Sequence, residues 1–230
     1  MARWLILLFV CLFAQPAGAE WYVGGQIGGV FPNTVTRANV QSATLPAGTS
    51  FSNVDLENSI MVGGKAGVWF TKQGYDWLGL ETNLQIARPD IAAQSIRTNL
   101  PTGFVFTAPA SCVGLTSCAV PSNGADLRVL TWAPFIVKAR YQSGPWQPYA
   151  GIGLGLFFAS TNVLGPVTST TEPGLVTQLG IEYKMNDQLG LFGEWGYQHA
   201  NLGFSSGSTT LSADYNAHVL AFGLNLHLPQ

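Results

Sequence analysis

Residues 77–88 read Trp-Leu-Gly-Leu-Glu-Thr-Asn-Leu-Gln-Ile-Ala-Arg and alternate between apolar and polar or small side chains. The even-numbered positions hold the aliphatic residues Leu78, Leu80, Leu84 and Ile86, and the odd-numbered positions hold Gly79, Glu81, Asn83 and Gln85. Successive side chains of a β-strand point to opposite faces of its sheet. The stretch therefore predicts a strand with one apolar face and one polar face.

The same alternation recurs along the chain. Segments of similar length and pattern occupy residues 21–31, 59–70, 77–88, 127–141, 148–160, 174–185, 189–202 and 215–228. Pro134 interrupts the fourth segment, and a proline inside a strand predicts a bulge. Such a bulge would place Leu130 and Trp132 on the same side as Phe135.

The connections between these segments alternate in length. Residues 32–58, 89–126, 161–173 and 203–214 form the long connections, and residues 71–76, 142–147 and 186–188 form the short ones. If neighbouring segments run antiparallel, all long connections lie at one end of the sheet. Barrels of the outer membrane have this asymmetry, with tight periplasmic turns and longer external loops.

Composition agrees with strands that lie in lipid. Only 10% of the residues are charged, against about 25% in an ordinary soluble domain, and the mean hydropathy is positive. Beyond the N-terminal region, no stretch approaches the ~20 apolar residues of a transmembrane helix. A net charge of −2 offers no basic surface, so nucleic acid is excluded as a partner.

The N-terminus has the pattern of a secretory signal peptide. Arg3 precedes the apolar run of residues 4–13, and Ala17-Gly18-Ala19 forms a small-residue cleavage site before Glu20. We therefore expect residues 1–19 to be removed between Ala19 and Glu20. The mature domain would then span residues 20–230, with long external loops at residues 32–58 and 89–126.

Cysteine use agrees with export. After cleavage, Cys112 and Cys118 remain, both in the longest polar connection. In an oxidising compartment such a pair is expected to form a local disulfide. The connection has no histidine to complete a metal site, and we expect neither a metal nor another cofactor.

Aromatic residues lie near both ends of the segments, as in the girdles of a membrane barrel. Those at the short-turn ends are Trp21, Tyr22, Phe70, Trp77, Tyr141, Tyr149 and Tyr183, and those near the long connections are Phe31, Tyr197 and Tyr215.

The set of polar residues at alternate strand positions is predicted to fill the barrel lumen. It comprises Lys65, Glu81, Asn83, Gln85, Lys138, Arg140, Gln178, Glu182, Lys184 and Glu194, together with Gln26 and Gln198. Eight strands enclose only enough room for side chains, and buried charges must pair. Lys65 and Glu81 flank one short turn and are expected to meet. We favour a plugged polar core over an ion-conducting path.

Three stretches resemble the opacity-type, outer-membrane-protein-A-like β-barrels. They are Trp21-Tyr22-Val23-Gly24-Gly25 with Gly28-Gly29, the run Pro148 to Gly155, and the closing run Asp214 to Leu224. The chain departs from that family in ending at Leu228-Pro229-Gln230 instead of an aromatic residue. The resemblance implies an outer-membrane barrel, which contacts lipid, lipopolysaccharide and the barrel assembly machinery. The family has several roles, so function is left open.

An enzyme is a third alternative. The segment His199-Ala200-Asn201-Leu202-Gly203 distantly resembles the His-x-Ser-Asn segment of lipid A acyl hydrolases, but alanine occupies position 200. Ser205 and Ser206 are nearby candidates, although a nucleophile must reach its base. We expect His199, His218 and His227 to be rim histidines at the membrane interface.

Specific function is expected in the long connections. Within residues 89–126, exposed Phe104, Val105 and Phe106 form either a contact patch or a short strand over residues 102–108, and the strand is favoured. The fold expected is thus an all-β, eight-stranded, antiparallel up-and-down transmembrane barrel of a Gram-negative outer membrane. The function expected is a non-enzymatic surface protein whose loops serve adhesion or recognition of a host or cell-surface ligand. A small ion or solute channel is the alternative.

Overall fold

The computed structural model describes residues 19–35, 37–42, 45–71, 74–105, 107, 110–142 and 144–229. The signal peptide expected at residues 1–19 lies outside the described residues except for Ala19. Phe106 also lies outside them.

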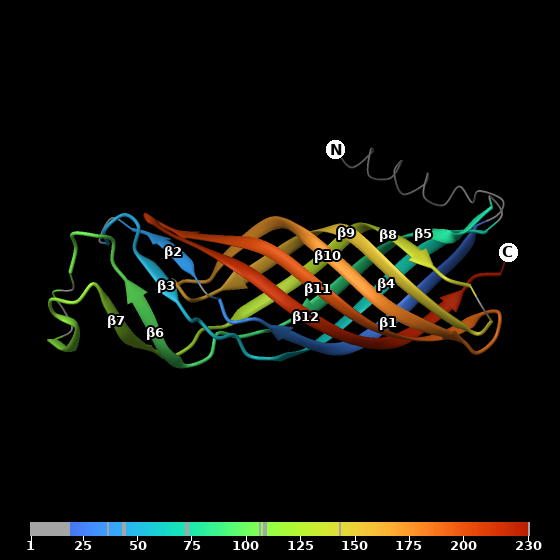
Figure 1. Cartoon of the computed structure of the whole chain (residues 1–230), viewed down its shortest axis with the longest axis horizontal. Coiled ribbons are helices and arrows are strands. Elements are labelled where there is room, and N and C mark those ends of the chain that lie inside the picture. Colours follow the sequence, from blue (N-terminus) through green and yellow to red (C-terminus); the bar gives the residue numbers. More distant parts are fainter. Residues whose placement is uncertain are drawn as a thin grey trace.

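The described part of the chain forms one antiparallel sheet of twelve strands. Eight long strands follow one another around a ring, and β1 pairs with both β4 and β12, which closes it into an elongated barrel (Figure 1). These eight strands are β1 (Glu20–Pro32), β4 (Ser59–Phe70), β5 (Tyr75–Ala87), β8 (Leu127–Arg140), β9 (Trp146–Thr161), β10 (Thr168–Lys184), β11 (Leu189–Ser206) and β12 (Thr209–His227). The predicted antiparallel up-and-down all-β fold is confirmed.

Four shorter strands extend the sheet at one end. They are β2 (Ala38–Gln41), β3 (Ser50–Ser52), β6 (Gln94–Asn99) and β7 (Ser117–Ser122). β12 extends beyond the end of β1, and its residues 210–213 pair with β2 instead. From β2 the sheet continues through β3 and β6 to β7. The hairpin of β6 and β7 projects past the ends of the barrel strands (Figure 1).

Apolar side chains face outward from the barrel and polar side chains face its interior, as the sequence predicts. Large apolar residues such as Ile60, Leu154 and Phe222 point outward and are 75%, 71% and 65% exposed. The polar residues of the opposite parity are buried inside the ring. A belt of exposed aliphatic side chains around a closed ring is the surface that hydrocarbon requires. No helix among the described residues is long and apolar enough to cross a membrane.

The bulge predicted at Pro134 is confirmed. The register between β8 and β9 shifts between Trp132 and Phe135, and that between β5 and β8 shifts opposite it. The extra residue restores the outward direction of Trp132, which is 41% exposed.

Two expectations about the long connections were wrong. The strand expected at residues 102–108 is absent from the described part of that stretch, where Thr102 and Gly103 form a turn, and β6 forms upstream instead. The long connections expected at residues 161–173 and 203–214 are short. β9 and β10 are joined by residues 162–167, and β11 and β12 by a tight turn at Gly207 and Ser208, where Gly207 has φ +57°.

The inward–outward alternation continues along the whole length of the last two strands, but the polarity of their two faces reverses part-way. At the C-terminal end of β12, Leu224 and Leu226 face outward and Asn225 inward, whereas towards its N-terminal end Ser212 and Asp214 face outward and Leu211 and Tyr215 inward. β11 reverses in the same way beyond His199, with Leu202 and Phe204 inside. A strand of 9–11 residues is enough to cross a bilayer. The remainder of each strand therefore stands outside the lipid, with an apolar interior like that of a soluble barrel.

Candidate functional site

The central lumen holds a neutral cluster of two lysines and two glutamates. Lys138 Nζ lies 2.8 Å from Glu81 Oε2, and Lys65 Nζ lies 3.0 Å from Glu194 Oε2. The expected partners Lys65 and Glu81 approach within 3.9 Å, so each has a closer partner elsewhere. Because β4 and β11 lie across the lumen from each other, the Lys65–Glu194 pair depends on closure of the ring.

Further hydrogen bonds reach both carboxylates of this cluster. Glu81 accepts from Tyr22 Oη at 2.7 Å and from Gln178 Nε2 at 2.9 Å, and Glu194 accepts from Tyr149 Oη at 2.8 Å. Lys138 Nζ also lies 3.8 Å from the centroid of the Tyr149 ring. Such ion pairs and hydrogen bonds offset the cost of burying these charges.

A second ionic cluster lies at the short-turn end of the lumen. Arg140 Nη2 donates to Glu20 Oε2 at 2.6 Å, and Lys184 Nζ pairs with the other oxygen of the same carboxylate. His227 Nε2 lies 2.6 Å from Glu182 Oε1, and its Nδ1 lies 2.9 Å from Glu20 Oε1. Lys184 is the most exposed of the predicted lumen residues, because it lies where the lumen opens.

The predicted amides form a layer above the central cluster. Gln26 Nε2 donates to Asn83 Oδ1 at 2.9 Å, and Gln198 Nε2 donates to Gln85 Oε1 at 2.6 Å. Thr131 completes the layer by donating to Gln198. The structure thus brings the predicted polar residues together in three successive layers along the lumen.

Sequence reasoning did not predict Thr131 and assigned four further members of these layers to other places. Glu20 was treated only as the residue after the cleavage site, Tyr22 and Tyr149 were assigned to the interfacial girdle, and His227 was assigned to the membrane rim. All four are buried inside the ring. Their positions in the alternating pattern could have identified them, since each lies at an inward-facing position of its strand.

Glycines opposite the two tyrosines make room for them. A Cβ on Gly67 would lie 2.5 Å from the Tyr22 ring, and one on Gly180 would lie 2.4 Å from the Tyr149 ring. Each ring therefore lies flat over a glycine of the neighbouring strand and places its hydroxyl on a buried carboxylate.

Above the amide layer the interior is apolar. Val30, Val176, Val219, Phe157 and Tyr215 lie at this level and are buried. Further out, between the barrel wall and the extracellular segments, lies a cavity of about 120 Å³ with almost wholly apolar walls.

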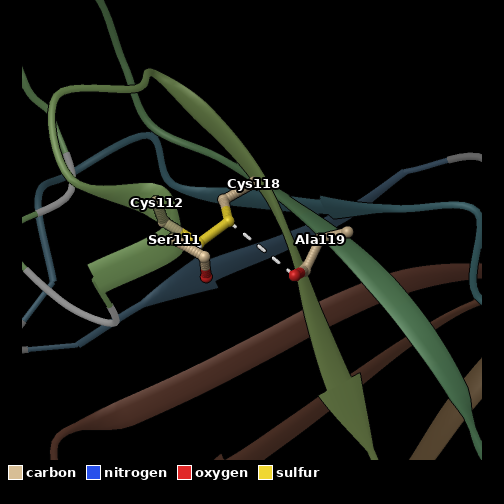
Figure 2. The surroundings of a disulfide bond; sticks show 4 residues. All are labelled: Ser111, Cys112, Cys118 and Ala119. Atoms are coloured by element: carbon tan, nitrogen blue, oxygen red, sulfur yellow. Dashed lines mark hydrogen bonds between the residues drawn. A yellow bond between two sulfur atoms is a disulfide. The ribbon is translucent and has the colours of Figure 1, made fainter.

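The β6–β7 hairpin carries the predicted disulfide. Cys112 at the end of the short 3₁₀ helix η2 (Ala110–Cys112) is bonded to Cys118 at the start of β7, with their Cα atoms 5.6 Å apart (Figure 2). The bond ties the tip of the hairpin to its returning strand.

The hairpin tip is uncharged and apolar. Residues 98–125 contain no Asp, Glu, Lys, Arg or His. Phe104, Val105, Val113 and Leu115 are each about half exposed there. We refer to these four residues as the tip patch.

The residues considered for an acyl hydrolase are not assembled. His199 points outward, and its Nδ1 lies 2.7 Å from Asn216 Oδ1. Ser205 lies six positions further along β11, roughly 20 Å away at the usual strand rise, which is far beyond the reach of a base. His218 packs outside the barrel between Trp195 and Tyr197. Among the residues that the structure describes, no three His, Cys, Asp or Glu side chains are grouped to hold a metal ion.

Comparison with known proteins gives one family match. The family model described as "Outer membrane protein beta-barrel domain" matches residues 5–227. No curated protein sequence matches the chain.

Two solved structures are similar in fold. Neisserial surface protein A (NspA) is 16% identical, with 91% of this chain and 98% of that chain covered and a TM-score of 0.51. The outer membrane protein OprG from Pseudomonas aeruginosa is 14% identical, with 93% and 97% covered and a TM-score of 0.60. At these identities the similarity concerns the fold alone.

Proposed function

Because the chain belongs to the outer membrane protein beta-barrel domain family and is a protein of the bacterial outer membrane, we propose that it is a non-enzymatic surface protein. In this proposal the β6–β7 hairpin recognises an uncharged, apolar surface outside the cell. The outward face of the barrel contacts lipid and lipopolysaccharide, and the barrel assembly machinery inserts it. Export requires removal of residues 1–19 before Glu20.

The observation that carries the proposal is the tip patch. Exposed apolar groups are costly in water and mark an interaction site when they are gathered on one projection. The β6–β7 connection that carries the patch lies beyond the rim of the barrel (Figure 1), and the Cys112–Cys118 disulfide constrains the segment that carries Val113 and Leu115. Preorganisation of this kind lowers the entropy cost of binding.

The lumen supports a role other than ion conduction. Two ion-paired layers and one amide layer cross it, and the side chains of Lys65, Glu81 and Lys138 are no more than 2% exposed. Moving an ion through would separate these buried pairs, which is strongly unfavourable. The enzymatic alternative has no support from His199, whose ring bonds to Asn216 Oδ1, an oxygen that also accepts from Tyr197 Oη.

The proposal is tested by adhesion of cells that express the protein. Retention is measured on supported phosphatidylcholine bilayers and on octyl-coated glass, for wild type and for a Phe104→Ser and Val105→Ser double variant. Val167→Ser is the matched control, because Val167 is 75% exposed on a different external connection.

The tip variant is expected to lose most of the retention on both surfaces, and the control is expected to keep it. Equal retention of wild type and the tip variant would overturn the proposal, as would the absence of retention above cells that lack the protein.

A further inference from the structure

The apolar cavity lies in the part of the barrel that stands outside the lipid. Its wall combines barrel strands with extracellular segments, including Val54, Leu56, Ile91, Leu127, Phe204 and Leu211. The extracellular segments are joined to one another by isolated bridges between Val35 and Val54 and between Leu56 and Ile91. The cavity is therefore enclosed by paired backbone on several sides.

The size of the cavity fits one small molecule. An apolar cavity of about 150 Å³ in another protein stays free of water and binds benzene. The cavity here is about 120 Å³, and its walls offer almost no hydrogen-bonding groups to water. Small barrels that hold one ligand do so in an interior of this kind.

Tyr215 is one of the few residues with a polar side chain in the cavity wall. The residue is 2% exposed and its ring packs edge-on against Phe157, with the centroids 6.2 Å apart. Its hydroxyl makes no hydrogen bond to any residue that the structure describes, although buried hydroxyls usually have a partner. The Tyr215 side chain also lines a smaller void below the cavity, together with Gln85, Thr131 and Gln198.

The other polar side chains of the wall are already engaged. Thr161 Oγ1 accepts from Val163 N at 3.2 Å, and the exposed carboxylate of Asp214 accepts from Asn201 Nδ2 at 2.8 Å. Among these side chains, Tyr215 Oη is the group that neither donates nor accepts a hydrogen bond within the described residues.

We propose that this cavity binds a small molecule with a benzene-sized apolar body and one hydroxyl or carbonyl group, which hydrogen-bonds to Tyr215 Oη. Charged molecules are excluded, because the wall has no cation and an anion or ammonium group would lose its hydration without a counter-charge. The site is separate from the tip patch and does not depend on the function proposed for the hairpin.

Binding is measured by ¹⁹F NMR with 4-fluorophenol and fluorobenzene, on protein in lipid nanodiscs with empty nanodiscs as the blank. The wild type is expected to bind both probes saturably, with 4-fluorophenol roughly five-fold tighter through one net hydrogen bond. Tyr215→Phe is expected to remove that preference and to keep fluorobenzene binding.

Ala38→Met fills the cavity and is expected to abolish the binding of both probes, because Ala38 is buried in its wall. Ala119→Met is the matched control, an identical change at an exposed position of β7 that leaves both probes bound. This comparison is independent of whether the Tyr215 variant folds. Absence of saturable binding in the wild type, unchanged binding in Ala38→Met, or a persistent phenol preference in Tyr215→Phe would overturn the proposal.

Discussion

Glu81→Gln is the most informative perturbation of the lumen. The carboxylate of Glu81 is fully buried and lies 2.8 Å and 3.9 Å from the ammonium groups of Lys138 and Lys65. Its removal leaves two buried cations facing one remaining anion, Glu194. Breaking a buried pair by removing one partner costs about 3–5 kcal/mol. With a urea slope of ~2 kcal/mol per M, the unfolding midpoint would fall by about 1.5–2.5 M.

The assay is equilibrium urea unfolding in phosphatidylcholine vesicles, followed by tryptophan fluorescence. The second variant is Glu81→Gln with Lys138→Met, which restores neutrality with a side chain of similar length. It is expected to recover at least ~2 kcal/mol of the loss, since a neutral replacement of a buried pair is often tolerated. Glu57→Gln removes an exposed carboxylate and controls for surface charge.

The reasoning would be refuted by a loss below about 1 kcal/mol for Glu81→Gln. A double variant no more stable than the single variant would also contradict it, because the cost would then lie in packing and not in the unpaired charge.

Three further outcomes follow from the same structure. In planar bilayers the wild type should show no large, stable conductance, because the paired layers close the lumen; a steady open channel would contradict this. Gly180→Val should cost about 1–3 kcal/mol in the urea assay by displacing the Tyr149 ring, whereas Gly25→Val, with open space at its Cβ, should cost nothing measurable. Replacing Cys112 and Cys118 by alanine should leave the barrel midpoint unchanged but speed protease cleavage within residues 100–116 on intact cells by ~30-fold, from a local cost of about 2 kcal/mol. Equal cleavage rates would show that the disulfide does not order the tip.

Parity along the strands predicted much of the fold and of the lumen. In the segment of residues 77–88 it separated Leu80 and Leu84 from Glu81 and Asn83 before any pairing was known. The same rule would have placed Tyr22, Tyr149 and His227 inside. They were missed because residue type, which favours aromatic and histidine side chains at the membrane interface, was given more weight than position.

Ion pairs between residues on non-adjacent strands could not be predicted from the sequence. Lys65 and Glu81 are neighbours on adjacent strands, so their approach could be expected, but the closer Lys65–Glu194 contact joins residues 129 positions apart. It depends on the closure of β12 onto β1 and on the register of every strand between them.

Residues 203–214 were wrongly predicted to be a loop, because the outward and inward faces of β11 and β12 exchange polarity there. Beyond His199 and Asn216 the outward side chains become polar and the inward ones apolar, so the stretch 203–214 resembled a loop when it was compared with the lipid-facing pattern. The alternation itself continues there without a break. In the hairpin, the alternation of residues 102–108 was outweighed by the pairing of β6 with β7, which places Thr98 opposite Cys118.

The reversal of polarity along β11 is tested most directly by single cysteines on its outward face. Ser205→Cys and Leu191→Cys share one parity, above and below the proposed membrane boundary, and the native pair Cys112–Cys118 is bonded. With a membrane-impermeant maleimide on intact cells, Ser205→Cys is predicted to react and Leu191→Cys to remain unlabelled until the barrel is unfolded. Protection of Ser205→Cys, or labelling of Leu191→Cys in the folded barrel, would contradict the account.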